Sequence, residues 1–192
     1  DVRLRDACRE NEDIGHVFAP PVLDDYNTLR STQIVKLNND RWAVVLGNGY
    51  NSKNQRPVLL IQYLDGNREL VRLVATGNAS TGATPGTTDN GLSAPRVVDI
   101  NADGRPDVVY AGDIKGHLWK FVIASANPDE WGVAFNGQPM FTAMGPPENA
   151  TGASRTERQP ITAAPTVRAN DRKMQTTDLQ NNLKTVNVGG MM

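Results

Sequence analysis

The chain has 192 residues, of which 39% are hydrophobic, and its charge is balanced at a formal −1. That charge gives no overall footprint for nucleic acid, and no segment holds the roughly 18 consecutive apolar residues that a membrane-spanning helix needs. Its single cysteine, Cys8, excludes a disulfide within the chain and a cysteine zinc site. The hydrophobic content is enough for one domain, or for part of a larger one. Because the chain begins at Asp1 and carries no signal-like segment, we expect a processed or excised piece.

Short β-branched or aromatic runs between turn residues predict β-strands throughout the chain. These runs lie at 33–37, 41–46, 57–63, 69–75, 94–98, 107–111, 117–123, 161–167 and 185–189. Asp65-Gly66 predicts a tight hairpin between the third run and the fourth. In 117–123 the alternation places Trp119, Phe121 and Ile123 on one face, which is typical of a half-buried strand.

The stretches between the strands predict long irregular loops at about 76–93, 124–160 and 168–184. The first is rich in Gly, Ser, Thr and Asn, so we expect it to be exposed and mobile. The last is polar and helical only in part. Since no window has the pattern of a long amphipathic helix, the sequence predicts an all-β fold in which 1–192 is a single domain or a fragment of one.

Three stretches of the chain resemble one another, each with a strand, an acidic or Asn-rich turn, a strand and a glycine. They cover 33–47, 96–112 and, in a more degraded form, 165–172 continued at 186–189. The first two lie about 63 to 65 residues apart. Such repeats favour part of a β-propeller built of antiparallel blades, while a plain meander or sandwich with coincidental hairpins is the alternative.

The acidic segment 99–107 matches the spacing D-x-N-x-D-G-x-x-D, which is most of an EF-hand calcium loop. Calcium takes six to eight oxygen ligands, and alternate positions of a tightly wound loop point inward. The predicted ligands are the side chains of Asp99, Asn101, Asp103 and Asp107 and the backbone carbonyl of Arg105. Gly104, between Asp103 and Arg105, permits the sharp turn.

Two features of this loop depart from the EF-hand. Tyr110 occupies the twelfth position, where a bidentate Glu would normally lie, and strands rather than helices flank the loop. We therefore expect a strand-flanked calcium site with weaker selectivity over magnesium. The alternative is a solvated turn without a metal. The equivalent turn of the first repeat, 38–40, lacks the ligand series, so one site is expected in this chain.

Several strings together resemble the PilY/PilC family of type IV pilus biogenesis factors and tip adhesins. They are WAVVLGNGYNS at 42–52, the whole run 99–121 with VYAGD at 109–113 and GHLWKF at 116–121, and QPITAAP at 159–165. The resemblance extends from about Gly15 to the C-terminus. It implies a modified β-propeller with one EF-hand-like calcium loop and the same five ligand positions. Asn101 stands where many members have Asp, which implies a lower affinity.

The resemblance also implies a function, which we state as an expectation. The chain would be a non-enzymatic, calcium-binding part of an exported protein at the pilus tip, the cell surface or the outer membrane. Calcium occupancy would regulate pilus extension against retraction in twitching motility and adhesion. Minor pilins or other pilus components, and host-surface receptors, would be its partners. The alternatives are a quinone-dependent dehydrogenase, suggested by Gly116-His117-Leu118-Trp119, and an integrin-like calcium-dependent protein-binding propeller.

Overall fold

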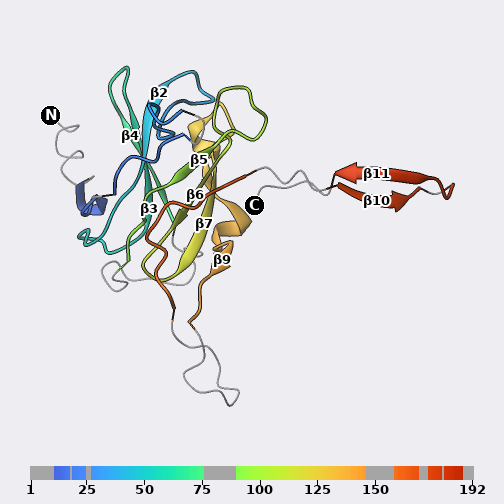
Figure 1. Cartoon of the computed structure of the whole chain (residues 1–192). Coiled ribbons are helices and arrows are strands. Elements are labelled where there is room, and N and C mark those ends of the chain that lie inside the picture. Colours follow the sequence, from blue (N-terminus) through green and yellow to red (C-terminus); the bar gives the residue numbers. More distant parts are fainter. Residues whose placement is uncertain are drawn as a thin grey trace, which may run out of the picture.

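The computed structural model describes residues 11–17, 19–24, 27–75, 90–145, 158–168, 173–178 and 180–187. Within these residues nearly all regular structure is β-strand, arranged in two larger antiparallel sheets and a separate two-stranded hairpin (Figure 1). The prediction of an all-β fold is confirmed. No helix in the described part is long and apolar enough to cross a membrane.

The first sheet is an antiparallel meander in the order β1 (Ile34–Lys36), β2 (Trp42–Gly47), β3 (Val58–Tyr63) and β4 (Leu70–Val74). β1, β3 and β4 lie inside predicted runs, and β2 extends one residue past its predicted run, to Gly47. Leu59 and Ile61 on one face of β3 are buried, and so are Val58 and Leu60 on the other, so this strand is covered on both faces.

The β3–β4 hairpin forms as predicted, but its turn is wider than the Asp65-Gly66 signal indicates. The amide of Tyr63 donates to the carbonyl of Glu69, which leaves 64–68 in the loop. Asp65 is held elsewhere, because it accepts hydrogen bonds from Arg41 Nε at 2.7 Å and from the Trp42 amide at 3.1 Å. These contacts tie the turn to the start of β2.

The second sheet has the order β5 (Arg96–Val98), β6 (Val108–Gly112), β7 (His117–Val122) and β8 (Gly132–Val133), and β9 (Phe141–Thr142) also pairs with β7. The last two strands lie in 124–160, which was predicted to be an irregular loop. That prediction is wrong in part, since β8, β9, η3 (Pro128–Glu130) and the short turn α2 (Ala134–Gly137) are ordered there. Two-residue strands between prolines leave no period that a sequence pattern could reveal. A further short helix, η1 (Asn11–Asp13), precedes the first sheet.

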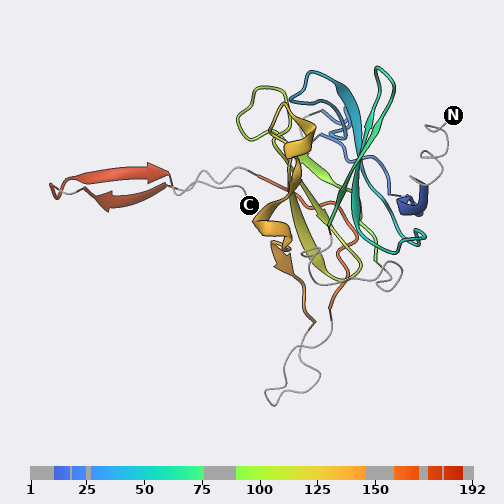
Figure 2. The ribbon, with the colours of Figure 1, turned by 180° about the vertical axis from the view of Figure 1, so that it is seen from behind.

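The core lies between the two larger sheets, where their apolar faces meet (Figures 1 and 2). From β7 and its end come Trp119, Phe121 and Ile123, all of which are buried, so the predicted half-buried face is confirmed. Val35, Ala43, Val45, Leu59 and Ile61 face them from the first sheet. The two sheets therefore pack as neighbouring blades of a propeller would.

Asn48, directly after β2, is a fully buried polar residue that joins four segments. Its Oδ1 accepts hydrogen bonds from the amides of Val58 at 3.0 Å and Leu92 at 2.9 Å. Its Nδ2 donates to the carbonyls of Asp13 at 2.7 Å and Arg56 at 2.8 Å. All four of its hydrogen-bonding positions are satisfied, as burial of an amide requires.

The predicted exposed loop at 76–93 is partly wrong. Residues 76–89 lie outside the described part, but Asn90, Leu92 and Ser93 are buried. Leu92 enters the core and forms a bridge with Asp113 of the second sheet. A single leucine in a polar stretch gives no periodic signal, which is why the sequence pattern missed it.

The C-terminal part also differs from the prediction. No strand forms in 161–167, where Pro165 cannot donate to a sheet ladder, although Ile161 N bonds to Asp113 O and Arg96 Nε bonds to Pro165 O. The polar stretch 168–184, predicted as a partly helical loop, instead contains β10 (Lys173–Thr177), which pairs with β11 (Leu183–Asn187). This hairpin lies apart from the two sheets in both views (Figures 1 and 2). The third repeat is thus not a blade in the described residues, and its Asn170-Asp171 turn lies outside them.

Candidate metal centre

The acidic segment 99–107 connects β5 to β6 as a strand-flanked loop, as the sequence predicts. Val98 pairs with Val108, and the amide of Asp107 donates to the carbonyl of Val98 at 2.9 Å. The two strands therefore fix both ends of the loop close together. Its middle, including Asn101 and Asp103, is exposed to solvent.

The two end carboxylates of the loop turn inward onto its backbone. Asp99 accepts the amide of Ala102 on Oδ1 and the amide of Gly104 on Oδ2, both at 2.7 Å. Asp107 accepts the amide of Ile100 on Oδ2, also at 2.7 Å. These bonds wind the segment into a closed turn.

The middle of the loop repeats this pattern. Asn101 Oδ1 accepts the amide of Asp103 at 2.9 Å, and Asp103 Oδ1 accepts the amide of Arg105 at 2.8 Å. Ala102 and Gly104 have left-handed backbone, with φ of 61° and 87°. The predicted role of Gly104 at the sharp turn is confirmed, because this conformation is easily adopted by glycine.

The donors of this loop fit a hard cation chemically. Three carboxylates, an amide carbonyl and a backbone carbonyl are all oxygen ligands of the kind that calcium prefers. In the part of the chain that the structure describes, however, no three acidic, histidine or cysteine side chains converge as a metal-binding group. The four side chains bind loop amides instead, so their convergence on one ion stays a prediction.

The loop is anchored to the first sheet through the turn 38–40. Asn38 Nδ2 donates to the carbonyl of Pro106 at 2.7 Å and to the carbonyl of Ile123 at 3.2 Å. In the opposite direction, Arg105 Nη2 forms a 2.7 Å ion pair with Asp40 Oδ1. Hydrogen bonds from Lys36 and then Arg105 hold the pKa of the Asp40 carboxyl below its usual value.

The contact between this turn and the acidic loop was not predicted, although the two occupy equivalent places in the repeat. The signal was available in the repeat, because equivalent turns of adjacent repeats lie at the same edge of neighbouring sheets. A depression of about 340 Å³ adjoins the loop, lined in part by Asp24, Arg30, Asp99 and Gly104. The loop is exposed to solvent in its middle and is also held by the first sheet.

A second polar cluster surrounds Asp113, at the turn between β6 and β7. Asp113 is fully buried and its Oδ2 accepts hydrogen bonds from Asn90 Nδ2 at 2.9 Å and Trp119 Nε1 at 2.8 Å. His117 contributes its backbone amide and its Nδ1, each at 2.9 Å. Burial raises the pKa of Asp113, but the hydrogen bonds from His117, Trp119 and Asn90 outweigh burial, so the pKa is lowered.

This cluster accounts for the string that suggested a quinone-dependent enzyme. Trp119 is buried in the core and its indole N–H is bound to Asp113. His117 Nε2 lies 2.8 Å from Arg158 Nη1, which ties β7 to the segment after β9. The string therefore has a packing role in this structure.

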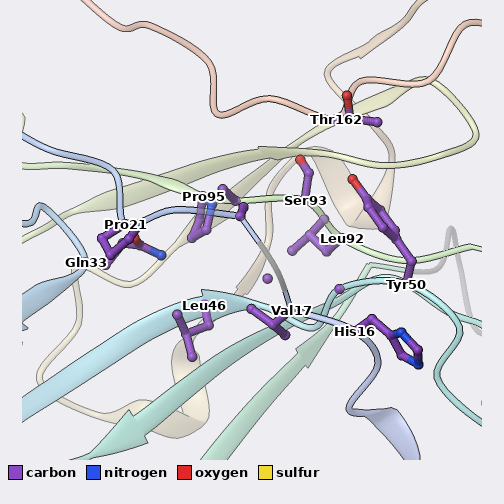
Figure 3. Close-up of a pocket in the computed structure, with 14 residues that line it drawn as sticks. His16, Val17, Pro21, Gln33, Leu46, Tyr50, Leu92, Ser93, Pro95 and Thr162 are labelled. Carbon is purple, nitrogen blue, oxygen red and sulfur yellow. The ribbon is translucent and has the colours of Figure 1, made fainter.

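A small cavity lies where the segment before β1 meets the end of β2 and the segment before β5 (Figure 3). It has a volume of about 90 Å³, and Val17, Pro21, Leu46 and Leu92 contribute apolar walls. The amide of Gln33 is already bound to the main chain of Val22 and Val45. The other polar residues that line the cavity are His16, Tyr50, Ser93 and Thr162, so its surface is mixed.

Comparisons with known proteins agree with this architecture of packed antiparallel sheets. The crystal structure of the Pseudomonas aeruginosa PilY1 C-terminal domain superposes with a TM-score of 0.60 and 33% sequence identity, over 83% of this chain and 30% of that one. Residues 22–180 match the family model of the PilY1 beta-propeller domain. The chain belongs to this β-propeller family.

Curated relatives extend this similarity to full-length proteins. The type IV pilus biogenesis factor PilY1 of P. aeruginosa strain PAO1 is 35% identical over 174 residues, which is 82% of this chain. A PilY1 homolog of Xylella fastidiosa is 38% identical over 146 residues, or 70% of this chain. The chain spans only 13% and 9% of the length of these two proteins. The resemblance to the pilus family and the propeller prediction are thereby confirmed.

Proposed function

We propose that this chain is a calcium-binding part of the propeller domain of a type IV pilus biogenesis factor, and that it acts without catalysis. The observation that carries the proposal is the loop 99–107, which combines a five-oxygen calcium motif with a closed turn between two strands. Membership of the PilY1 β-propeller family supports the pilus context, since its curated relatives are named as type IV pilus biogenesis factors.

The residues of the loop would hold the cation through Asp99, Asn101, Asp103 and Asp107 with the carbonyl of Arg105. Bound calcium would supply the positive charge that offsets three neighbouring carboxylates. The chain itself provides the rest: β5 and β6 fix the ends of the loop, and the side chain of Arg105 reaches the first sheet. Ion occupancy would in this way stiffen the contact between the two sheets.

In the whole protein, this stiffening would regulate pilus extension against retraction, and so twitching motility and adhesion. The protein would act at the pilus tip or cell surface. Minor pilins or other pilus components would be its partners, and host-surface receptors would be bound at the tip. These roles rest on the family and on the loop together.

The direct test is titration of the purified chain with calcium chloride by calorimetry. We expect a one-to-one isotherm and, because no bidentate Glu completes the loop, only modest preference for calcium over magnesium. Asp103→Ala should abolish the isotherm, since it removes a carboxylate from the centre of the motif. Asp129→Ala, which changes an exposed acid in η3, is the matched control and should bind as the wild type does. Unchanged binding by Asp103→Ala would refute the site.

A second measurement tests the link between the ion and the fold. Limited proteolysis in calcium should cut 99–107 more slowly than in EDTA, because a bound ligand stabilises the folded state of the loop. Equal cleavage in both buffers, alongside a normal isotherm, would show that the ion binds without stiffening the loop.

A further inference from the structure

Two adjacent asparagines in the turn between β1 and β2 point in different directions. Asn39 binds its own sheet: its Nδ2 donates to the Tyr63 hydroxyl at 2.7 Å, and its Oδ1 accepts the Arg41 amide at 3.3 Å. Asn38 instead reaches the second sheet, where it donates to the carbonyls of Pro106 and Ile123. The same residue type therefore serves two separate sheets from neighbouring positions.

The contact of Asn38 falls at a sensitive point of the acidic loop. Pro106 lies between the predicted ligands Arg105 and Asp107, and its nitrogen cannot donate a hydrogen bond. The carbonyl of Pro106 accepts a hydrogen bond from Asn38 Nδ2 at 2.7 Å. The carbonyl of Ile123, directly after β7, accepts a hydrogen bond from the same amide group. Since Ile123 N also donates to the carbonyl of Asp107, the end of the loop is tied on two sides.

Arg105 makes the reciprocal connection. Its backbone amide donates to Asp103 inside the loop, and its guanidinium reaches the carbonyl of Asn38 at 3.3 Å and the carboxylate of Asp40 at 2.7 Å. An unpaired guanidinium beside a cation site would repel the cation. Asp40 draws this charge toward the first sheet and offsets it there.

We infer that Asn38 and Asp40 are positioning residues for the acidic loop, supplied by the neighbouring sheet and lying outside the motif. Asn38 sets the path of the loop at Pro106, and Asp40 holds the guanidinium of Arg105 away from the carboxylates. The affinity of the loop for a cation therefore depends on the first sheet. The part of this inference that concerns affinity rests on the proposed calcium function, whereas the part that concerns loop conformation does not.

The experiment compares Asn38→Ala with Asn39→Ala in the full chain, using calcium chloride as the probe. Asn38→Ala should weaken calcium binding about five- to tenfold, the usual effect of losing one or two hydrogen bonds, and Asn39→Ala should bind within twofold of the wild type. In EDTA, amide hydrogen exchange at Ile100, Ala102 and Gly104 should accelerate about tenfold in Asn38→Ala only. These amides report directly on the closed turn of the loop.

Asp40→Asn provides a second variant if Asn38→Ala does not fold, because Asp40 lies on an exposed turn and can be changed with little effect on the core. It should weaken calcium binding at least threefold, since it releases Arg105. Lys36→Ala is its control, because it removes the other ion-pair partner of Asp40 and leaves Arg105 in place.

The outcomes separate the two claims. If the wild type binds calcium and Asn38→Ala matches Asn39→Ala in both affinity and exchange, the inference is overturned and the proposed function stands. If the wild type binds no calcium, the proposed function falls, and the exchange rates in EDTA alone decide whether Asn38 sets the conformation of the loop.

Discussion

Asp113 shows how one buried carboxylate can hold several segments together. Burial of an ionised group is costly unless hydrogen bonds compensate for it. Asn90, Trp119 and two groups of His117 supply these bonds, from the segment before β5 and from β7. The lowered pKa indicates that the charged form is the one that the fold favours.

A prediction at this scale concerns stability at acid pH. Because its folded pKa is lowered, Asp113 contributes stability that is complete above the unfolded pKa of about 3.9 and is lost as the pH falls through the folded pKa. Asp113→Asn should cost about 1–3 kcal/mol at pH 7, and this difference should shrink below pH 4. Urea unfolding at several pH values measures both effects. A difference that is the same at pH 7 and pH 3 would contradict the assignment.

The chemistry of single residues could be predicted only where the groups involved lie in one short motif of the sequence. The spacing of Asp99, Asn101 and Asp103 identifies a candidate cation loop because all of its donors lie in one nine-residue segment. Asp113 and Asn38 gave no such signal. Asn90 lies 23 residues from Asp113 and Pro106 lies 68 residues from Asn38, and only the folded structure brings these pairs together. The partners His117 and Trp119 are close to Asp113 in sequence, but they form no known motif with it.

The end of β2 packs closely against the backbone of the segment before β5. A side chain at Gly47 would place its Cβ 2.0 Å from the carbonyl oxygen of Ser93 and 2.6 Å from that of Leu92. Backbone atoms cannot move aside as the end of a flexible side chain can. The junction thus requires glycine for space.

The corresponding prediction compares two glycines in strands. Gly47→Ala should destabilise the fold by about 1–3 kcal/mol, as overpacking does. Gly132→Ala in β8, where a Cβ would meet nothing within 4 Å, should stay within about 1 kcal/mol of the wild type. Thermal or urea unfolding of both variants provides the measurement. Equal stability of the two variants would show that the backbone around Gly47 makes room for the added Cβ at no cost in free energy.

At the level of elements, β1 to β7 were predictable because each is a β-branched or aromatic run between turn residues. β8 and β9 were not, since each has two residues and takes its place from pairing with β7. β10 was missed because Lys173, Gln175 and its threonines form a polar strand without an apolar face. Pairing with β11, rather than burial, defines this strand.

On the scale of the whole molecule, the two sheets share one core and the β10–β11 hairpin stands outside it (Figures 1 and 2). Every residue of β10 is exposed, including Met174 at 55%. The first two repeats predicted neighbouring blades, and these residues form the two sheets. The degraded third repeat also predicted a blade, but the chain forms the separate β10–β11 hairpin within that region instead.

Truncation of the chain tests this division. Residues 1–168 alone should unfold in one cooperative transition, with a free energy within about 0.5 kcal/mol of the full chain, as is usual for changes at an exposed surface. Chemical unfolding followed by tryptophan fluorescence is suitable, because Trp119 and Trp131 are buried in the shared core. Loss of the transition would show that the hairpin contributes to the core.

The buried amide of Asn48 has a consequence for the chemical ageing of the chain. Asn48 precedes Gly49, and an asparagine before a glycine deamidates readily when the glycine nitrogen can attack the side-chain amide. Here the Asn48 side chain is held by four hydrogen bonds, and the Gly49 nitrogen is bound to the carbonyl of Leu92 at 3.0 Å. The native fold therefore keeps both reactants out of reach of each other. Once the chain unfolds, conversion of Asn48 to an acid would replace its two hydrogen-bond donors with a negative charge. Such a chain could not rebuild the buried site around residue 48. We therefore expect the protein to lose its ability to refold faster when it is stored unfolded than when it is stored folded.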